Sequence, residues 1–588
     1  MKSKKYFTPL FLFLTFLWVN GQDPAVHSHN DYLQDVPFWK AISAGVLSVE
    51  SDVFLMGGKL MVAHEKEHII EDRTLESLYL KPINEFLQLN LIPNKKLQLL
   101  IDLKSEAYTT LDAIVKELKK YPTIINNKNI SIVISGNRPK VEDYSNYPHF
   151  ILFDYQDLRP IKNKELLDKI GLISLSFRNF SDWNGLGRLT KHDLVLVDSV
   201  VEKAHSFKKP FRFWATPDSK TSWKAMADLG VNFINTDRPF ECVQYVNSLS
   251  QRVYVNQEKH EPYLPNFEND GSDEVPKNII LMIGDGNGLA QISATALANG
   301  GSLSLTQLKN IGFSKTQSAD DFTTDSAAGA TAMATGTKTA NRAIGVDLNG
   351  KKVPNVMELL QAKNFTTAIV TTDEISGATP ASFFAHQIER SMSEEILHDL
   401  ETSKLDFFVA TGNQDKVSGQ EYLGFKIADN LKMLETSETN KMAYFFPKEN
   451  TVLPIQDAVR SILNKFQKSQ TPFFLMVEGA KIDSYGHANK IDGIIDESIA
   501  FDKAVSEALR FADDVKNTLV IITADHETGG LTIPQGNVKD KEVEADFTTN
   551  DHTGIFVPVF AYGPQSQLFR GVYENTEIHH KILEALGL

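Results

Sequence analysis

Short apolar runs alternate with amphipathic stretches through the first part of the chain. Two of the amphipathic stretches, 111–121 and 222–230, have helical spacing. The apolar runs predicted as buried strands are 97–105, 130–136, 149–155, 172–177, 193–199, 211–216 and 231–237. Repeated strand–helix units predict a parallel sheet, and about eight strands predict a closed TIM-like (β/α)8 barrel.

The second part opens with the apolar run NIILMIGDG, 278–286, which predicts a strand that leads into a loop. Further strands are predicted at 366–373, 473–479 and 518–525, and a helical pattern spans 495–514. This alternation predicts an α/β domain with an open sheet. Polar residues follow the strand ends, where open α/β sheets place their sites.

A polar, proline-containing stretch near 250–276 separates the two parts and has neither helical nor strand period. The boundaries that we predict are a signal peptide at 1–21, a barrel at 22–248, a linker at 249–275 and an α/β domain at 276–588. The chain has 588 residues and 42% hydrophobic content, which is enough for two cores.

The N-terminus has the pattern of a signal peptide. Lys2, Lys4 and Lys5 precede an apolar run, and small residues end at Gly21 before the expected cleavage site. The run is too short to span a bilayer comfortably, so an uncleaved anchor is the weaker interpretation. We therefore expect a periplasmic or secreted protein with no further transmembrane segment.

Composition narrows the function classes. A formal charge of −15 argues against nucleic-acid binding, which needs clustered basic surface. The single cysteine, Cys242, excludes an internal disulfide and is predicted to pack as a small hydrophobe.

Carboxylates and histidines lie near the ends of the predicted strands of the second part, most of them after a strand and His552 before one. They are Asp285, Asp373, Glu478, Asp483, His487, Asp525, His526 and His552. Each alone has an ordinary explanation, as a helix cap, a solvated helix face or a core histidine. Together they form a mixed set in which imidazole plus carboxylate suits Zn²⁺ and oxygen alone suits Mg²⁺. The GDGNG loop lacks the spacing of a dinucleotide-binding fingerprint.

The stretch TTDSAAGATAMATGTKT, 323–339, leaves two interpretations open. Asp325 and Ser326 stand before an alanine-rich run, which is typical of a capped helix. Alternatively, Ser326 is a nucleophile and the small residues let a substrate and metals approach.

These motifs together resemble serine-type alkaline phosphatases over residues 276–588. The matching segments are MIGDGNG, the 17 residues above, ATPASFFAHQIER, VEGAKIDSYGH, TADHETGG and HTG. The resemblance implies one Zn²⁺ on Asp483, His487 and His552, and a second on Asp285, Asp525 and His526. It also implies a Mg²⁺ site that Asp285 reaches and that Thr379 and Glu478 complete.

By the same resemblance, Ser326 would be the nucleophile, activated by a neighbouring Zn²⁺, and Arg390 the phosphate clamp. Asp325 is expected to be a positioning neighbour. Two departures stand out: relatives often carry Asp or His where this chain has Gly377, and Lys or His where it has Ser484. The first puts the Mg²⁺ site in question and the second the strength of phosphate binding.

A second candidate site lies in the first part. His27 and His29 flank Ser28, and Glu50 and Asp52 lie two apart in a strand pattern, so their side chains share one face. The other candidates are His64, Asp102 and Lys104. The alternative is an unstructured HSHND segment and an ESD turn.

This part resembles the glycerophosphodiester phosphodiesterase and phosphatidylinositol-phospholipase-C-like barrels over residues 24–245. HSHNDY, SVESD, VAH, LIDLKS, FRFWATPD and GVNFINTDRP match in order. The resemblance implies Mg²⁺ or Ca²⁺ on Glu50, Asp52 and Asp102. It also implies acid–base catalysis by His64 and His27, with His29 as the alternative to His27. Lys104 would bind the charge of the phosphodiester. HSHND replaces the usual HRG opening.

The leading hypothesis is an exported enzyme that acts on small-molecule phosphate esters, including phospholipid-derived diesters. The barrel would cut a diester and the second domain would hydrolyse the resulting monoester. One alternative makes the barrel a non-catalytic tether. Another makes the second domain a diesterase or a sulfatase. A homodimer is a family expectation.

Overall fold

The computed structural model describes residues 24–91, 96–412, 421–447 and 452–588, so the predicted signal peptide lies outside the described residues. The chain divides into two compact units between Leu249 and Ser250. Within the described ranges, every helix is too short or too polar for a bilayer crossing.

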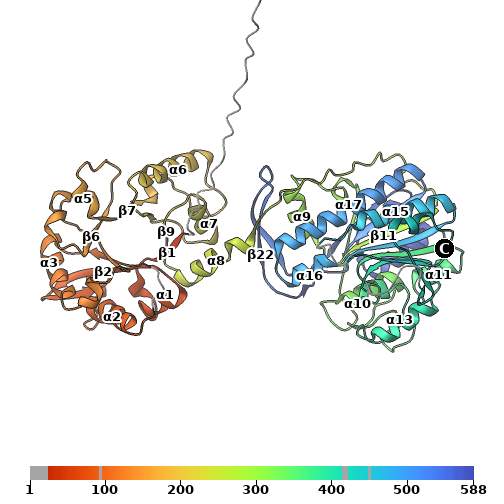
Figure 1. Cartoon of the computed structure of the whole chain (residues 1–588), viewed down its shortest axis with the longest axis horizontal. Coiled ribbons are helices and arrows are strands. Elements are labelled where there is room, and N and C mark those ends of the chain that lie inside the picture. The colour runs from red at the N-terminus through yellow and green to blue at the C-terminus, as the bar shows by residue number, and fades with distance from the viewer. Residues whose placement is uncertain (1–23, 92–95, 413–420, 448–451) are drawn as a thin grey trace, which may run out of the picture. The chain divides into compact units, whose positions relative to one another are not determined.

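In the described part of the first unit, eight parallel strands close into a barrel (Figure 1). In their order around the barrel they are β1 (Ala25–Ser28), β2 (Ser48–Met56), β4 (Leu97–Leu103), β5 (Ile130–Gly136), β6 (Ile151–Tyr155), β7 (Ile170–Ser176), β8 (Phe211–Trp214) and β9 (Phe233–Thr236). Pairing of β9 with β1 closes the ring. β3 (Lys59–Val62) adds an antiparallel hairpin to β2.

Alternation along β4 sets which side chains point into the barrel. Leu100 packs in a small inner cluster with Val133, whereas Leu99 and Ile101 pack in the large cluster between the strands and the helices. Asp102, two residues after Leu100, therefore shares the inner face.

The helices of this unit are α1 (Trp39–Ala44), α2 (Lys81–Gln88), α3 (Ala107–Leu118), α4 (Pro122–Ile125), α5 (Lys164–Asp168), α6 (Lys191–His205), α7 (Lys220–Asp228) and α8 (Pro239–Arg252). The strand predicted at 193–199 is wrong, because these residues lie within α6. The Thr190 side chain caps this helix, and its buried residues recur at helical spacing: Val197, Val200, Val201 and Ala204. β1 and β2, both absent from our list of apolar runs, complete the eight strands. Cys242 is buried in α8, as expected.

The second unit is built on a mixed sheet. Its strands, in spatial order, are β15 (Glu421–Tyr422), β16 (Phe425–Ile427), β17 (Met442–Phe445), β14 (Phe407–Thr411), β13 (Thr366–Glu374), β18 (Phe473–Gly479), β11 (Asn278–Gly284), β19 (Thr518–Thr523), β24 (Val557–Tyr562), β12 (Asn310–Lys315) and β25 (Gly571–Glu574). The four strands β13, β18, β11 and β19 are neighbours and run parallel.

Helices cover both faces of this sheet, as predicted (Figure 1). One face packs α15 (Ile455–Ser469) and α17 (Ile491–Val515), and the other packs α10 (Ser326–Thr335), α11 (Val356–Gln361) and α18 (Thr576–Ala585). The remaining helices are α9 (Leu289–Ala298), α12 (Ala378–Ala381), α13 (Ser393–Thr402), α14 (Leu431–Thr436) and α16 (Lys481–His487). This unit also has two small sheets. In one, β22 (Glu542–Phe547) lies between β10 (Val253–Val255) and β21 (Leu531–Asn537), and in the other, β20 (Glu527–Thr528) pairs with β23 (His552–Thr553).

The segment predicted as a linker packs on the second unit. Its β10 pairs with β22, and His260 Nε2 lies 2.8 Å from Asp502 Oδ2 on α17. The Tyr263 hydroxyl donates to Asp513, also on α17, over 2.7 Å. These buried polar contacts explain why a stretch without periodicity is ordered.

Candidate functional site

The four adjacent parallel strands of the second unit bring their carboxyl ends together. In register, Ile283 of β11 pairs with Glu478 of β18 and with Thr523 of β19, and Thr371 of β13 also pairs with Glu478. The predicted residues at these ends therefore converge because of sheet topology alone.

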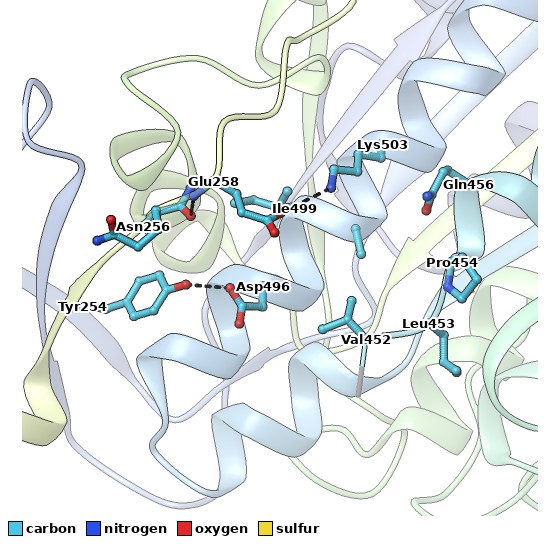
Figure 2. Close-up of a pocket in the computed structure, with 12 residues that line it drawn as sticks. Tyr254, Asn256, Glu258, Val452, Leu453, Pro454, Gln456, Asp496, Ile499 and Lys503 are labelled. Atoms are coloured by element: carbon cyan, nitrogen blue, oxygen red, sulfur yellow. Dashed lines mark hydrogen bonds and ion pairs between the residues drawn. The ribbon is translucent and has the colours of Figure 1, made fainter. Parts of the chain in front are cut away.

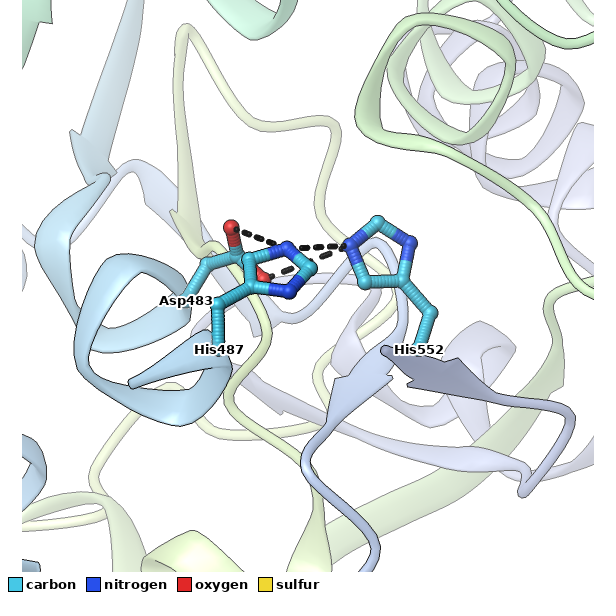
Figure 3. Close-up of side chains that lie close together, drawn as sticks. All are labelled: Asp483, His487 and His552. Carbon is cyan, nitrogen blue, oxygen red and sulfur yellow. Dashed lines mark hydrogen bonds and ion pairs between the residues drawn. The ribbon is translucent and has the colours of Figure 1, made fainter. Parts of the chain in front are cut away.

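Asp483, His487 and His552 form one cluster (Figure 3). His487 Nε2 lies 3.3 Å and His552 Nε2 3.4 Å from the Asp483 carboxylate, and the two Nε2 atoms are 3.0 Å apart. Each Nδ1 lies against a backbone carbonyl, of Asn550 and Thr324 respectively. That contact leaves the Nε2 lone pairs free to face inward, which is the orientation of a metal-binding imidazole.

The electrostatics of this cluster follow from its contacts. The hydrogen bond to Asp483 raises the pKa of His487 to about 9. Burial works against ionisation of Asp483, yet hydrogen bonds from His487 and His552 hold its pKa well below the usual range. A cation at the centre would replace the proton that the imidazoles share with this carboxylate.

Asp285, Asp525 and His526 form a second, buried cluster. His526 Nε2 lies 3.4 Å from Asp285 Oδ1 and 3.2 Å from Asp525 Oδ2. Among the described residues these two carboxylate oxygens have no hydrogen-bond partner. Buried oxygens without donors, arranged around an imidazole, fit a divalent cation.

Burial and mutual repulsion perturb the second cluster. Burial and the charge of Asp525 raise the pKa of Asp285, and burial and Asp483 raise that of Asp525 to about 6. Burial and the neighbouring His552 lower the pKa of His526 to about 3, so this imidazole is neutral and available as a ligand.

Ser326 is the first residue of α10 and is buried. The Asp325 carboxylate caps the helix by accepting from Ala328 N over 3.0 Å. Ser326 Oγ lies 3.3 Å from His526 Nε2, at the edge of the second cluster. The capped-helix interpretation of the 323–339 stretch is confirmed, and the same cap places Ser326 beside the candidate metal ligands, where the nucleophile interpretation needs it.

Arg390 contacts the carboxylate that caps α10. Its Nη1 donates to Asp325 Oδ2 over 3.0 Å, and its backbone N–H donates to Arg342 O over 2.7 Å. The helix cap therefore also orients the guanidinium, which stays partly exposed.

Thr379 and Glu478 are the two residues that, with Asp285, would form the Mg²⁺ site that the resemblance implies. Both side chains are buried, and the Thr379 hydroxyl has no hydrogen-bond partner among the described residues. Burial, together with the charge of Asp373, raises the pKa of Glu478 to about 8. Ser484 is exposed on α16.

The barrel brings its predicted residues together at one end. Glu50, Asp52 and Asp102 form a cluster in which one carboxylate oxygen from each lies within 4.8 Å of the others, close enough to hold one cation. Lys104 Nζ lies 3.0 Å from Asp52 and 3.2 Å from Asp102, and a pocket of about 280 Å³ adjoins Lys104 and His64. Burial and the charge of Glu50 raise the pKa of Asp102 to about 6.

The three barrel histidines differ in access. His27 is fully buried, with Nδ1 2.7 Å from Ser48 Oγ and Nε2 2.7 Å from Glu50. His29 is partly exposed; its Nδ1 lies 2.8 Å from Asp237 and its Nε2 3.9 Å from Glu50. His64 is half exposed and lies 3.0 Å from Asp52.

Sequence reasoning missed Arg212, which lies buried inside the barrel. Its Nη1 donates to Glu50 over 2.8 Å and to Asn235 over 3.1 Å, and it contacts His27 Nε2. A lone charge within the apolar run FRFW was the available signal, because a buried arginine needs a carboxylate partner. Tyr32, whose hydroxyl donates to Asp52 over 2.9 Å, carried no such signal.

A pocket of about 520 Å³ in the second unit holds none of the predicted site residues (Figure 2). It lies between the 254–258 segment and α17, where the Tyr254 hydroxyl donates to Asp496 over 2.7 Å. Size alone therefore does not locate the chemistry of this unit.

Comparison with known proteins agrees with the geometry. The alkaline phosphatase family model matches residues 276–410, 425–545 and 535–588, about half of the chain, and the chain belongs to this family of phosphate-monoester hydrolases. In the first unit, a model described as an AIM6-like phosphodiesterase domain matches 20–92, and one described as the glycerophosphoryl diester phosphodiesterase family matches 210–239. The chain thus joins an alkaline phosphatase to a phosphodiesterase-type barrel.

Alkaline phosphatase 4 of Bacillus subtilis is 31% identical, over 53% of this chain and 88% of the relative. Alkaline phosphatase of Escherichia coli is 29% identical, over 54% and 87%. A solved structure, alkaline phosphatase from the Antarctic bacterium TAB5, is 38% identical, over 53% of this chain and 99% of that chain, with a TM-score of 0.49.

Proposed function

We propose that the second unit hydrolyses phosphate monoesters through a phosphoserine on Ser326, with Zn²⁺ in the two clusters. The observation that carries this proposal is the position of Ser326 Oγ, 3.3 Å from His526 in the second cluster and at the N-terminus of α10. Zn²⁺ bound there lowers the pKa of a coordinated oxygen and offsets phosphate charge.

In the proposed reaction, each of these residues has a separate role. Ser326 Oγ forms a bond to phosphorus, the bond to the ester oxygen breaks, and the alcohol leaves with a proton. Arg390 holds two phosphate oxygens, and the backbone N–H groups that begin α10 add positive potential. Water then attacks the phosphoserine, which releases phosphate and restores the serine. Asp325 positions Ser326 by capping α10 with a hydrogen bond from Ala328 N, and it positions Arg390 by accepting from Nη1.

The substitution Ser326→Ala tests this role in the full chain. We expect aryl phosphate turnover to fall by at least about 10³-fold, because no other group can carry the covalent step. Ser293→Ala, the same change on the exposed face of α9, is the control. Retained turnover in Ser326→Ala would reject the proposal. Higher turnover of aryl sulfate or bis-aryl phosphate than of aryl phosphate by the wild type would favour the sulfatase or diesterase alternative.

For the barrel we propose cleavage of phosphodiesters by His29 and His64 beside Mg²⁺ or Ca²⁺ on Glu50, Asp52 and Asp102. Oxygen-only ligation suits such hard cations, and the pocket beside His64 and Lys104 gives a diester access. Lys104 would bind the phosphate charge.

The choice of His29 over His27 rests on access and charge. Burial and the neighbouring Arg212 lower the pKa of His27 to about 3, and Glu50 and Ser48 engage both its ring nitrogens. Burial opposes protonation of His29 too, but the hydrogen bond to Asp237 and the charge of Glu50 raise its pKa. His29 can therefore exchange a proton with substrate, whereas His27 supports Glu50.

Three alanine variants test this assignment on an aryl phosphodiester. We expect His29→Ala and His64→Ala each to lower kcat by about 10²-fold or more and to change the pH profile. His27→Ala should keep the wild-type pH profile. The reverse result would return the role to His27. No diesterase activity in the wild type, with Mg²⁺ or Ca²⁺ supplied, would favour the tethering module.

We further propose that the protein is exported and that the two sites act in sequence, the diesterase forming the monoester that the phosphatase consumes. The lysine-flanked apolar start of the sequence supports export, and the presence of both sites in one chain supports sequential action. Homodimerisation is proposed from the family alone.

A further inference from the structure

The glycine that ends the GDGNG loop makes room for a buried carboxylate beside the two clusters. A Cβ on Gly288 would stand 2.5 Å from Glu527 Cγ, and Glu527 is only 1% exposed. Glu527 directly follows His526, and the loop that ends at Gly288 carries Asp285. A buried carboxylate is unfavourable unless donors surround it, so the partners of Glu527 show which segments it holds together.

Glu527 accepts hydrogen bonds from three other segments. Gln291 Nε2, on the helix α9 that follows the GDGNG loop, donates to Glu527 Oε1 over 2.7 Å. The backbone N–H of Leu531 donates to the same oxygen over 3.1 Å, and the Thr553 hydroxyl donates to Oε2. This one carboxylate, on β20, therefore connects α9, the start of β21 and β23.

The strand β23 has little packing of its own. It is two residues long and lies in a two-stranded sheet with β20, in which Glu527 pairs with Thr553 and Thr528 with His552. The structure describes all of residues 546–556, and none of them is buried. Two-stranded sheets are marginal without further contacts. The hydrogen bond from Thr553 to Glu527 therefore helps to fix the strand that carries His552.

His552 is the member of the first cluster whose position depends most on such a contact. Asp483 and His487 share the helix α16, which sets their spacing, whereas His552 comes from a separate segment (Figure 3). Its Nε2 lies 3.0 Å from His487 Nε2 and 3.4 Å from Asp483 Oδ1. Because metal–ligand distances vary by only about 0.2 Å, a small shift of β23 would remove this ligand.

We propose that Glu527 is a positioning residue that holds His552 in the first cluster through Thr553. Both of its oxygens are engaged by protein donors, so it acts on the cation through His552 and is not itself a ligand. The inference rests on the proposed function, because it takes the first cluster to bind Zn²⁺.

Chelator-competition titration of Zn²⁺ into the full, cation-free chain tests the proposal. We expect Thr553→Val, which removes the hydroxyl and keeps the shape, to weaken one of the two Zn²⁺ sites by about 10-fold, and Glu527→Ala to weaken it by about 10- to 100-fold. Thr532→Val, the same change at an exposed position of β21, is the control and should keep the wild-type Kd. In a His552→Ala background, Thr553→Val should cause no further loss, because the ligand that it positions is already absent.

A conservative variant separates positioning from a general loss of packing. In Glu527→Gln the amide oxygen can accept from Gln291 and the amide nitrogen can donate to the Thr553 hydroxyl, so most of the Zn²⁺ affinity lost in Glu527→Ala should return. If Glu527→Ala does not fold, Thr553→Val alone decides. Unchanged Zn²⁺ affinity in Thr553→Val, or an equal further loss in the His552→Ala background, overturns the inference. Wild type that binds no Zn²⁺ fails the proposed function instead.

Discussion

In the barrel, the Lys104 ammonium lies between Asp52 and Asp102, and the Arg212 guanidinium lies against Glu50. In the second unit, buried oxygens of Asp285 and Asp525 have no hydrogen-bond donor among the described residues, and the one guanidinium that we place at the site, Arg390, pairs with Asp325. Both units gather carboxylates at the ends of parallel strands. The barrel offsets part of their charge with its own Lys104 and Arg212, even though we propose a cation there too, whereas the oxygens of Asp285 and Asp525 have no such internal partner and fit the Zn²⁺ that we propose for them.

Removal of divalent cations should have the most different effects on the two units. We expect a chelator to lower phosphomonoesterase activity by about 10³-fold or more, since bound cations supply several kcal/mol of charge stabilisation. All five tryptophans lie in the first 249 residues, so tryptophan fluorescence reports on the barrel. Its urea midpoint should fall only slightly under chelation, because Lys104 and Arg212 still offset the carboxylate charge after the barrel's own Mg²⁺ or Ca²⁺ is removed. A large drop in that midpoint would show that the barrel depends on bound cations as strongly as the second unit does.

Loss of the Arg212 guanidinium from the barrel should have the next largest effect. Arg212→Met leaves Glu50 buried without its partner, and we expect the barrel to lose about 3–5 kcal/mol of stability. Urea unfolding followed by tryptophan fluorescence measures this loss. In Arg212→Met/Glu50→Gln most of the stability should return, because no unpaired charge remains. Equal losses in the single and double variants would contradict a charge-balance role.

Arg390 should matter through the geometry of its guanidinium. Arg390→Lys keeps the charge but loses the paired hydrogen bonds, so we expect kcat/KM for aryl phosphate to fall by about 10- to 100-fold. Steady-state kinetics measure the change. Arg342→Lys, on a neighbouring exposed arginine that pairs with Glu389, is the control. A wild-type value in Arg390→Lys would show that charge alone suffices.

The smallest predicted effect is a pH slope. The pKa of His487 is raised to about 9 in the cation-free protein, so below pH 9 a proton competes with Zn²⁺ for this imidazole. Apparent Zn²⁺ affinity should therefore rise with pH, by at most about tenfold per unit, and level off above pH 9. Competition titrations between pH 7 and pH 10 give the slope. In His487→Asn the slope should become shallower, and an unchanged slope would remove His487 from the ligand set.

Much of the phosphatase site could be predicted because its signals are local. Asp483 and His487 lie four residues apart on one helix. Asp285, Asp525 and His526 closely follow apolar strands, whereas His552 precedes one. Parallel strand topology then brings these ends together. The capped helix at Ser326 was also visible, since Asp325 and the alanine run encode it in sequence.

Contacts between distant residues could not be predicted in the same way. The pairing of Arg212 with Glu50 joins strands 162 residues apart, and nothing in the local pattern of either strand specifies it. Residues 193–199 look like a strand, but one face of the helix stays exposed at Leu194 and Val195, which periodicity alone did not reveal. Gly377, where relatives often carry Asp or His, is a further case: a Cβ there would stand 2.1 Å from Asp373 Oδ2, a close approach that the sequence does not indicate.

In the proposed reaction sequence, one chain converts a diester to free phosphate through a monoester. Phosphorus NMR of a glycerophosphodiester, incubated with the full chain and its cations, tests it most directly. The wild type should show transient monoester and then inorganic phosphate, Ser326→Ala should accumulate the monoester, and His64→Ala should leave the diester intact. Phosphate release by Ser326→Ala, or no diester consumption by the wild type, would contradict the account.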